Sequence, residues 1–293
     1  MFKEIVPLLS CPCCKKNFTC FPSEMENEEI TEGWIECESG HRYPIHKGVL
    51  NMGSAEQEDG NTWSDYYQEM SYEELDRALE EKKTENQRNI LHKFLKDTAA
   101  ETAKLKQGFL LDIASGRGML LSRMIENAGS DVHIISADLS FTVLMYDRLK
   151  FAEKARHLKV SYIACDATNL PFKPDSLDMA CSFSGFLNMG SLFESGIAEA
   201  ARILKKGAAL VHATAYMNPE TPGFREIEKI LETMNQKAFA RNLVQEDVLA
   251  LHRKYFSTAS DTFSYEGIAE GEEADLIPYH GDWFANAVIT AVK

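Results

Sequence analysis

This 293-residue chain has no long hydrophobic run and no excess of positive charge. It also has few cysteines after residue 37. No apolar run approaches the roughly 20 residues that a membrane-spanning helix needs, so no membrane partner is expected. The first residues lack the apolar core of a secretory signal, which makes a cytoplasmic, reducing location the expectation. Thirty-one Lys and Arg against 45 Asp and Glu give a net charge of −14. That balance disfavours tight non-specific nucleic-acid binding but does not exclude a local basic patch.

The cysteines that are present crowd at the N-terminus. Five of the 7 are Cys11, Cys13, Cys14, Cys20 and Cys37. In a reducing compartment such crowding indicates metal binding rather than disulfides. Two short pairs, Cys11 with Cys14 and Cys37 with His41, together predict a closed Cys₃His zinc site of the structural kind. We expect Cys13 to face away and Cys20 to be a spare thiol; the alternative is a degenerate module that keeps its shape without metal.

A glycine-containing turn near residue 115 is the most informative stretch of the chain. Residues 109–113 form a short apolar run, and residues 119–125 have apolar side chains at helical spacing. Small residues between them allow a sharp turn, and the helix start behind it offers free N–H groups to a ligand. The dinucleotide pattern needs a small residue three positions after its second glycine. Leu121 or Met119 stands there instead, which disfavours a pyrophosphate ligand.

Acidic residues end three successive predicted strands, at Asp112, Asp138 and Asp166. An acid at the tip of the second strand can accept hydrogen bonds from both ribose hydroxyls of a nucleoside. Leu139, beside it, is placed to pack on an adenine face. The alternative for each acid is a helix cap or turn aspartate.

These segments together resemble class I S-adenosylmethionine-dependent methyltransferases. The turn fits D-x-[GA]-x-G-x-G, with Ala114 where the family usually has glycine, and residues 166–172 match the family's D-A-x-x-L-P-F segment. The resemblance implies that S-adenosylmethionine is the cofactor, with the adenine amino group donating to Asp166. The cofactor-binding residues it implies are Asp112, Ala114, Ser115, Gly116, Gly118, Asp138, Leu139, Asp166, Ala167, Ser182 and Phe183.

The N-terminal segment resembles zinc ribbons of two kinds. One kind belongs to small proteins that activate partner methyltransferases, and the other precedes ribosomal RNA guanine methyltransferases. Residues 43–45 are more similar to the first kind, and the Cys-x₃-His pair to the second. The resemblance therefore keeps RNA open as a partner.

The expected fold is α/β: a doubly wound, mostly parallel, seven-stranded Rossmann-like sheet with a small N-terminal zinc ribbon. We expect three parts: a ribbon at 1–53, a linker with lid helices at 54–108, and the methyltransferase domain at 109–293. Ser71 and Glu74 predict a capping box at the start of a lid helix. Strands are expected near 256–266 and 283–292 at the C-terminal end.

The function expected from this reading is methyl transfer to a small-molecule acceptor. Two alternatives remain: a ribosomal RNA or tRNA methyltransferase whose ribbon recognises RNA, and a non-catalytic cofactor-binding scaffold. The catalytic residues are unknown, with His212, His280 and Tyr67 as candidates for a base.

Overall fold

Four parallel strands with almost entirely buried residues form the middle of the sheet. They are β5 (Gly108–Ile113), β6 (Val132–Asp138), β7 (Lys159–Ala164) and β8 (Leu177–Phe183). Their apolar runs are continuous because both faces are covered by helices. The computed structural model describes residues 1–53, 62–270 and 280–293. The predicted linker at 54–61 lies outside the described residues.

The sheet is wider than expected. It has 11 strands in the order β1-β2-β3-β4-β7-β6-β5-β8-β9-β11-β10, so the prediction of seven strands is wrong. Seven of these strands, from β7 to β10 in that order, correspond to the seven-stranded sheet that the sequence predicts. The other four come from the N-terminal segment: β1 (Phe18–Glu26), β2 (Glu29–Cys37), β3 (Arg42–His46) and β4 (Val49–Asn51).

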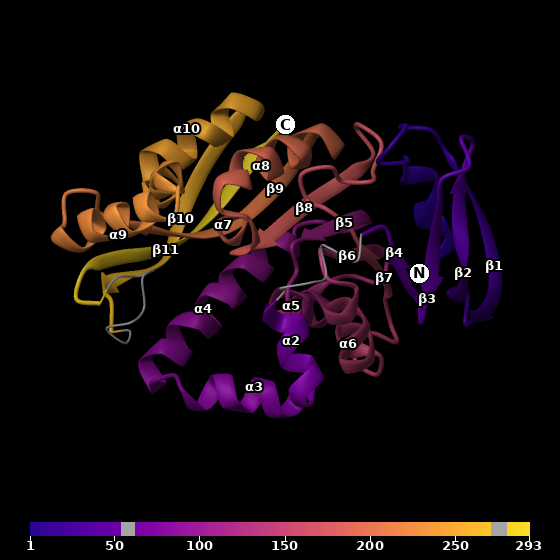
Figure 1. Cartoon of the computed structure of the whole chain (residues 1–293), viewed down its shortest axis with the longest axis horizontal. Helices are drawn as coiled ribbons and strands as arrows, with labels where there is room; N and C mark the ends of the chain where they lie inside the picture. Colours follow the sequence, from indigo (N-terminus) through magenta and orange to yellow (C-terminus); the bar gives the residue numbers. More distant parts are fainter. Residues whose placement is uncertain (54–61, 271–279) are drawn as a thin grey trace.

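The extra strands are joined to the central sheet by β4, which pairs in parallel with the outer edge of β7. Val49 lies opposite Tyr162, and Leu50 opposite Ile163. An ion pair reinforces this join, since the Arg148 guanidinium donates two hydrogen bonds to the Glu29 carboxylate, at 2.9 and 2.7 Å. The N-terminal segment therefore extends the central sheet, as Figure 1 shows on its indigo side.

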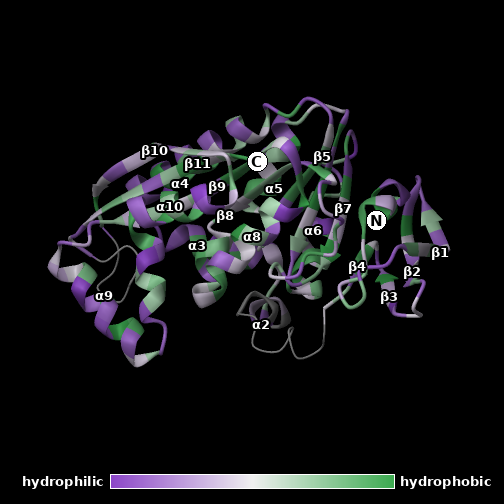
Figure 2. Ribbon diagram, turned by 90° about the horizontal axis from the view of Figure 1, so that it is seen from above, coloured by the Kyte–Doolittle hydropathy of each residue, from purple (hydrophilic) through white to green (hydrophobic). Residues whose placement is uncertain are grey.

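Helices cover both faces of the sheet. One face carries α4 (Glu85–Thr102), α5 (Met119–Asn127) and α6 (Phe141–Phe151). The other carries η1 (Lys3–Leu8), α8 (Phe193–Ile203) and α10 (Gln245–Tyr255). Hydrophobic residues concentrate along the central strands, whereas α9 (Pro222–Thr233) alternates hydrophilic and hydrophobic residues (Figure 2). The result is a three-layer α/β/α arrangement.

The segment before the first core strand forms α2 (Thr62–Glu69), α3 (Tyr72–Glu81) and α4, which lie along one side of the sheet (Figure 1). The predicted capping box is confirmed. The Glu74 N–H donates to the Ser71 hydroxyl at 3.2 Å, and the Ser71 N–H donates to the Glu74 carboxylate at 2.9 Å. A second box at Thr84 and Gln87 starts α4 in the same way.

The C-terminal part completes the sheet with β9 (Leu204–Met217), β10 (Thr258–Ile268) and β11 (Trp283–Val292). Both predicted final strands are confirmed within two residues at each end, and β11 inserts antiparallel between β9 and β10. Short helical elements α7 (Gly185–Asn188), η2 (Gly190–Leu192) and η3 (Lys237–Leu243) lie near the strand ends. Across the described residues, no helix is both long and apolar enough to cross a membrane.

Candidate active site

The glycine turn lies between β5 and α5 and has left-handed backbone at three positions. Ala114 has φ 53°, Gly116 φ 54° and Gly118 φ 67°. Glycine adopts this region without penalty, whereas a Cβ makes it costly. The left-handed backbone at position 114 therefore explains why the family usually has glycine there. The turn is tied to the next strand because the Ser115 N–H donates to the Ala137 carbonyl at 3.0 Å.

Side chains pack closely against one side of the turn. A Cβ on Gly118 would lie 2.5 Å from Phe151 Cε2 and 2.8 Å from an Asp147 carboxylate oxygen. A Cβ on Gly185 would lie 2.7 Å from the Ala114 Cβ and 2.6 Å from the Ser182 hydroxyl. In contrast, a Cβ on Gly116 would meet no described atom within 4 Å. The turn is thus closely packed at Gly118 and against Gly185, and open at Gly116.

The three acids differ in their surroundings. Asp112 is fully buried, accepts a 3.7 Å hydrogen bond from the Cys181 thiol, and has no described partner at its second oxygen. Burial raises its pKa to about 7. Asp138 is half-buried and accepts from the N–H groups of Gly116 at 2.8 Å and Ser140 at 3.1 Å.

Asp166 is also half-buried, and one of its oxygens accepts from both the N–H and the hydroxyl of Thr168, at 2.8 and 2.7 Å. Both Asp138 and Asp166 thus have the backbone-capping contacts expected of turn aspartates. The two hydrogen bonds to Asp166 use one oxygen of a carboxylate that has about four lone-pair sites.

A cavity of about 380 Å³ lies over the carboxyl ends of β5, β6 and β7. Six of the residues implied by the resemblance line it: Ala114, Gly116, Asp138, Leu139, Asp166 and Ala167. Asp112 and Ser182 are fully buried beneath it, and Ser115 and Gly118 belong to the turn without lining it. Sequence reasoning missed Thr168, Met189 and Leu192 in its wall. Thr168 lies two residues after Asp166, so its place in the matched segment was the available signal.

A second cavity, of about 690 Å³, adjoins the first one, and Asn188 lines both. Its walls come from α4, the end of β8, η3 and the ends of β9, β10 and β11. Phe183, implied by the resemblance to contact the cofactor, lines this second cavity, where its ring lies 4.7 Å from that of Phe94.

Two candidate bases are buried in the structure. His212 is fully buried; its Nδ1 lies 3.2 Å from His252 Nε2, and burial lowers its pKa well below the usual range. The hydroxyl of Tyr67 is buried as well, and burial raises its pKa. The described linings of the two cavities include neither these two residues nor the third candidate, His280.

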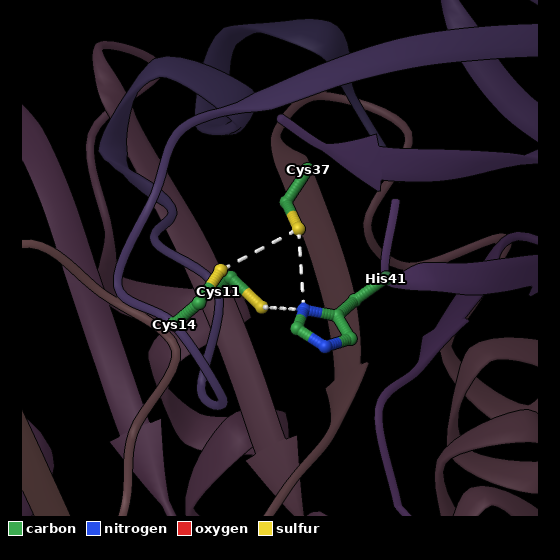
Figure 3. Close-up of side chains that lie close together, drawn as sticks. All are labelled: Cys11, Cys14, Cys37 and His41. Carbon is green, nitrogen blue, oxygen red and sulfur yellow. Dashed lines mark hydrogen bonds between the residues drawn. The ribbon is translucent and has the colours of Figure 1, made fainter. Parts of the chain in front are cut away.

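Cys11, Cys14, Cys37 and His41 come together in the N-terminal segment (Figure 3). Their ligand atoms all lie within 4.8 Å of one another. His41 Nδ1 is 3.4 Å from the sulfurs of both Cys11 and Cys37, and the Cys14 and Cys37 sulfurs are 3.6 Å apart. Cys13 and Cys20 are outside this group, and the Cys13 thiol lies 3.4 Å from the Tyr43 hydroxyl.

The surroundings of the cluster shift the pKa values of two of its thiols in opposite directions. Hydrogen bonds from the Lys16 N–H and the Ser39 hydroxyl lower the pKa of Cys14 to about 6. Burial raises the pKa of Cys11. A set of three sulfurs and one imidazole nitrogen is a donor set that soft divalent metals prefer.

The turn and the strands around it are similar to known proteins. Residues 110–207 match the family described as "Methyltransferase domain". The ubiquinone/menaquinone biosynthesis C-methyltransferase UbiE of Stenotrophomonas maltophilia (strain K279a) is 28% identical over 118 residues, 40% of this chain and 46% of that protein. Its counterpart in Rhizobium leguminosarum bv. trifolii is 27% identical over 124 residues, 41% of this chain and 48% of that protein. The chain thus spans about half the length of these curated relatives.

Solved structures show the same fold at low identity. The MccD protein aligns with a TM-score of 0.52 and 14% identity over 68% of this chain and 96% of its own. Haemonchus contortus phosphoethanolamine N-methyltransferase 2, solved with phosphomonomethylethanolamine and S-adenosylhomocysteine, aligns with a TM-score of 0.51 and 17% identity over 67% of this chain and 52% of its own. These similarities do not favour the RNA or scaffold alternatives. The chain therefore has a Rossmann-like α/β fold, and its residues 110–207 are similar to methyltransferase domains.

Proposed function

We propose that this protein transfers a methyl group from S-adenosylmethionine to a small-molecule acceptor. The observation that carries the proposal is the pair of adjoining cavities, one over the glycine turn and one under α4, with Asn188 in both linings. The cofactor, when bound, supplies an electrophilic methyl group. The residues of the chain then have to hold the two reactants in line, because orientation supplies much of the rate in such a transfer.

The cofactor cavity offers a partner for each polar part of a nucleoside. Asp138, at the end of β6, is placed to accept from ribose hydroxyls, and Asp166, after β7, to accept from an adenine amino group. Leu139 is 37% exposed beside Asp138, which suits packing on an adenine ring. We assign no direct contact to Asp112, because its buried carboxyl supports the turn from below.

The acceptor has to be reactive without a strong base from the protein. Among the described residues of the second cavity, only Lys83 and Glu270 carry titratable side chains. Glu270 accepts one hydrogen bond from the Asn86 amide, so its carboxylate keeps acceptor capacity and is a weak base at most. General-base catalysis requires a group within hydrogen-bond reach of the proton. The chain therefore acts mainly by binding and orienting the acceptor, and any released proton passes to water or to Glu270.

We further propose that the Cys₃His cluster holds one structural zinc ion. Zn–S bonds of about 2.3 Å and a Zn–N bond of about 2.0 Å imply tetrahedral S···S distances of about 3.8 Å and S···N distances of about 3.5 Å. Three of the six separations, at 3.4, 3.4 and 3.6 Å, fit that geometry, and all six lie within 4.8 Å. Four protein ligands leave no open position, so the ion would stabilise residues 1–53 and take no part in the reaction.

The same proposal divides the chain into a ribbon at 1–53, a linker with lid helices at 54–108 and a methyltransferase domain at 109–293. The lid assignment is supported by α4, whose side chains Ile90, Leu91 and Phe94 line the second cavity. The strands of residues 1–53 lie at the opposite end of the sheet from β9, β10 and β11, which line that cavity.

Methyl transfer from labelled S-adenosylmethionine tests the proposal. The protein is incubated with a small-molecule extract in one arm and with purified RNA in the other. Label in an organic-extractable product of the first arm is the expected result. Label only in RNA would refute the small-molecule assignment. No transfer in either arm, with S-adenosylhomocysteine still bound, would indicate a scaffold.

A further inference from the structure

The second cavity has the size and shape of a binding site for an organic molecule. Its volume of about 690 Å³ lies within the range of small-ligand pockets, about 300–1,000 Å³. Apolar side chains from four parts of the fold enclose it: Ile90, Leu91, Phe94, Phe183, Phe239 and Phe284. Phe94, Phe239 and Phe284 are each less than 8% exposed, so the aromatic wall is packed and already formed.

Positive charge is almost missing from its described lining. Lys83 is the one cation there, and its ammonium donates to the Leu79 carbonyl at 3.0 Å and the Glu80 carboxylate at 2.9 Å. The nearby anion, Glu270, accepts from the Asn86 amide at 3.0 Å. Segments 54–61 and 271–279, which the structure does not describe, contain no lysine or arginine. An anionic ligand would therefore be buried without a dedicated counter-charge, which is costly.

Neutral amides supply the polar part of the lining. Asn188, Gln236 and Asn286 come from α7, the residue before η3, and β11. Each amide both donates and accepts hydrogen bonds, so it can read a hydroxyl, a carbonyl or a ring nitrogen. Asn188 also lines the cofactor cavity, so this residue lies where the two cavities meet.

We propose that this cavity binds an uncharged, mostly apolar acceptor of aromatic or aliphatic character, with its reactive polar atom held at Asn188. This inference rests on the proposed function, because it names the substrate class of the same site. It disfavours phosphorylated and carboxylate acceptors, since the one cation in the described lining, Lys83, already pairs with Glu80.

Two dyes with the same ring system test the charge preference. N-phenyl-1-naphthylamine is neutral, and 8-anilino-1-naphthalenesulfonate adds one sulfonate to the same anilinonaphthalene framework. Fluorescence titration should show the neutral dye binding the wild-type chain at least about tenfold more tightly, which corresponds to about 1.4 kcal/mol. Equal or tighter binding of the sulfonate would overturn the proposal.

Two variants locate the dye in this cavity. Ala215 lines it from β9 and does not line the cofactor cavity, so Ala215→Phe should weaken the neutral dye about tenfold and leave S-adenosylhomocysteine affinity unchanged. Ile268 lines it and is 57% exposed, so Ile268→Lys should fold and tighten the sulfonate, whereas the control Ile268→Gln should not. An unchanged neutral-dye affinity in Ala215→Phe would place the dye elsewhere and refute the assignment.

The outcomes separate this inference from the proposed function. Failure of S-adenosylhomocysteine to bind, with dye selectivity intact, would refute methyl transfer and support the charge preference of the cavity. Normal S-adenosylhomocysteine binding with tighter binding of the sulfonate would refute only the acceptor class.

Discussion

Adding one methyl group at each of two glycines in the turn should separate backbone strain from packing. Gly116 and Gly118 both have left-handed backbone, so alanine at either position costs about 1–2 kcal/mol of strain. Stiffening of the unfolded chain returns about 0.4–1 kcal/mol in each case. Only Gly118 adds a clash, with Phe151 and Asp147, and overpacking of this kind costs about 1–3 kcal/mol.

Gly118→Ala should therefore lose about 1–5 kcal/mol of unfolding free energy, and Gly116→Ala at most about 2 kcal/mol. Urea unfolding followed by circular dichroism measures both, and the Gly118 variant should have the lower midpoint. Cofactor affinity, in contrast, should fall more in the Gly116 variant than in the Gly118 variant. Gly116 lines the cofactor cavity and its added methyl would enter open space, so S-adenosylhomocysteine should bind about tenfold more weakly to Gly116→Ala than to wild type. Equal midpoints, or a Gly118→Ala variant as stable as wild type, would refute the packing described beneath the turn.

Two further predictions concern Asp112 and the metal cluster. The pKa of Asp112 is raised to about 7 from an unfolded value of 3.8, so the stabilisation given by its protonated form is complete below pH 3.8 and is lost as the pH rises to about 7. Asp112→Asn should remove this dependence on pH. The unfolding free energy of the variant minus that of wild type should therefore rise between pH 4 and 7 and then level off. If this difference did not change with pH, the buried position of the Asp112 carboxyl would be contradicted. Cys37→Ser should lose one zinc per chain by elemental analysis and loosen residues 1–53 while keeping S-adenosylhomocysteine affinity, whereas Cys20→Ser, outside the cluster, should keep the metal. Wild-type protein purified without chelator and free of zinc would refute the metal proposal.

Local patterns allowed the parts of the fold that depend on neighbouring residues to be predicted. The apolar runs of β5 to β8 follow from burial on both faces, and the capping box at Ser71 depends on residues three positions apart. The glycine turn and the acids after β6 and β7 lie within short motifs. Their residues Gly116, Asp138 and Asp166 share one cavity because parallel strands end at the same edge of a sheet.

Features that arise from distant contacts could not be predicted in the same way. The pairing of β4 with β7 joins residues more than 100 positions apart, and a three-residue strand such as Val49–Asn51 has too short a pattern to indicate it. Gln236 and Asn286 also lacked a local signal, because their place in the second cavity depends on how α4 and β11 pack around the end of β8. The burial of Asp112 depends likewise on Cys181, from a different strand.

Calorimetric titration with S-adenosylhomocysteine tests the central claim most directly, namely that the glycine turn and the acid at the end of β6 form the cofactor site. Wild type should bind, and Asp138→Ala should bind more weakly by about 1.5–3 kcal/mol, because hydrogen bonds to a charged group are lost. Asp131→Ala is the matched control, since Asp131 is exposed just before the opposite end of the same strand and should leave binding unchanged. Circular dichroism should show both variants folded, because Asp138 also accepts from two backbone N–H groups. Wild-type affinity in a folded Asp138→Ala variant would contradict the ribose assignment, and a chain that binds NAD more tightly than S-adenosylhomocysteine would contradict the cofactor itself.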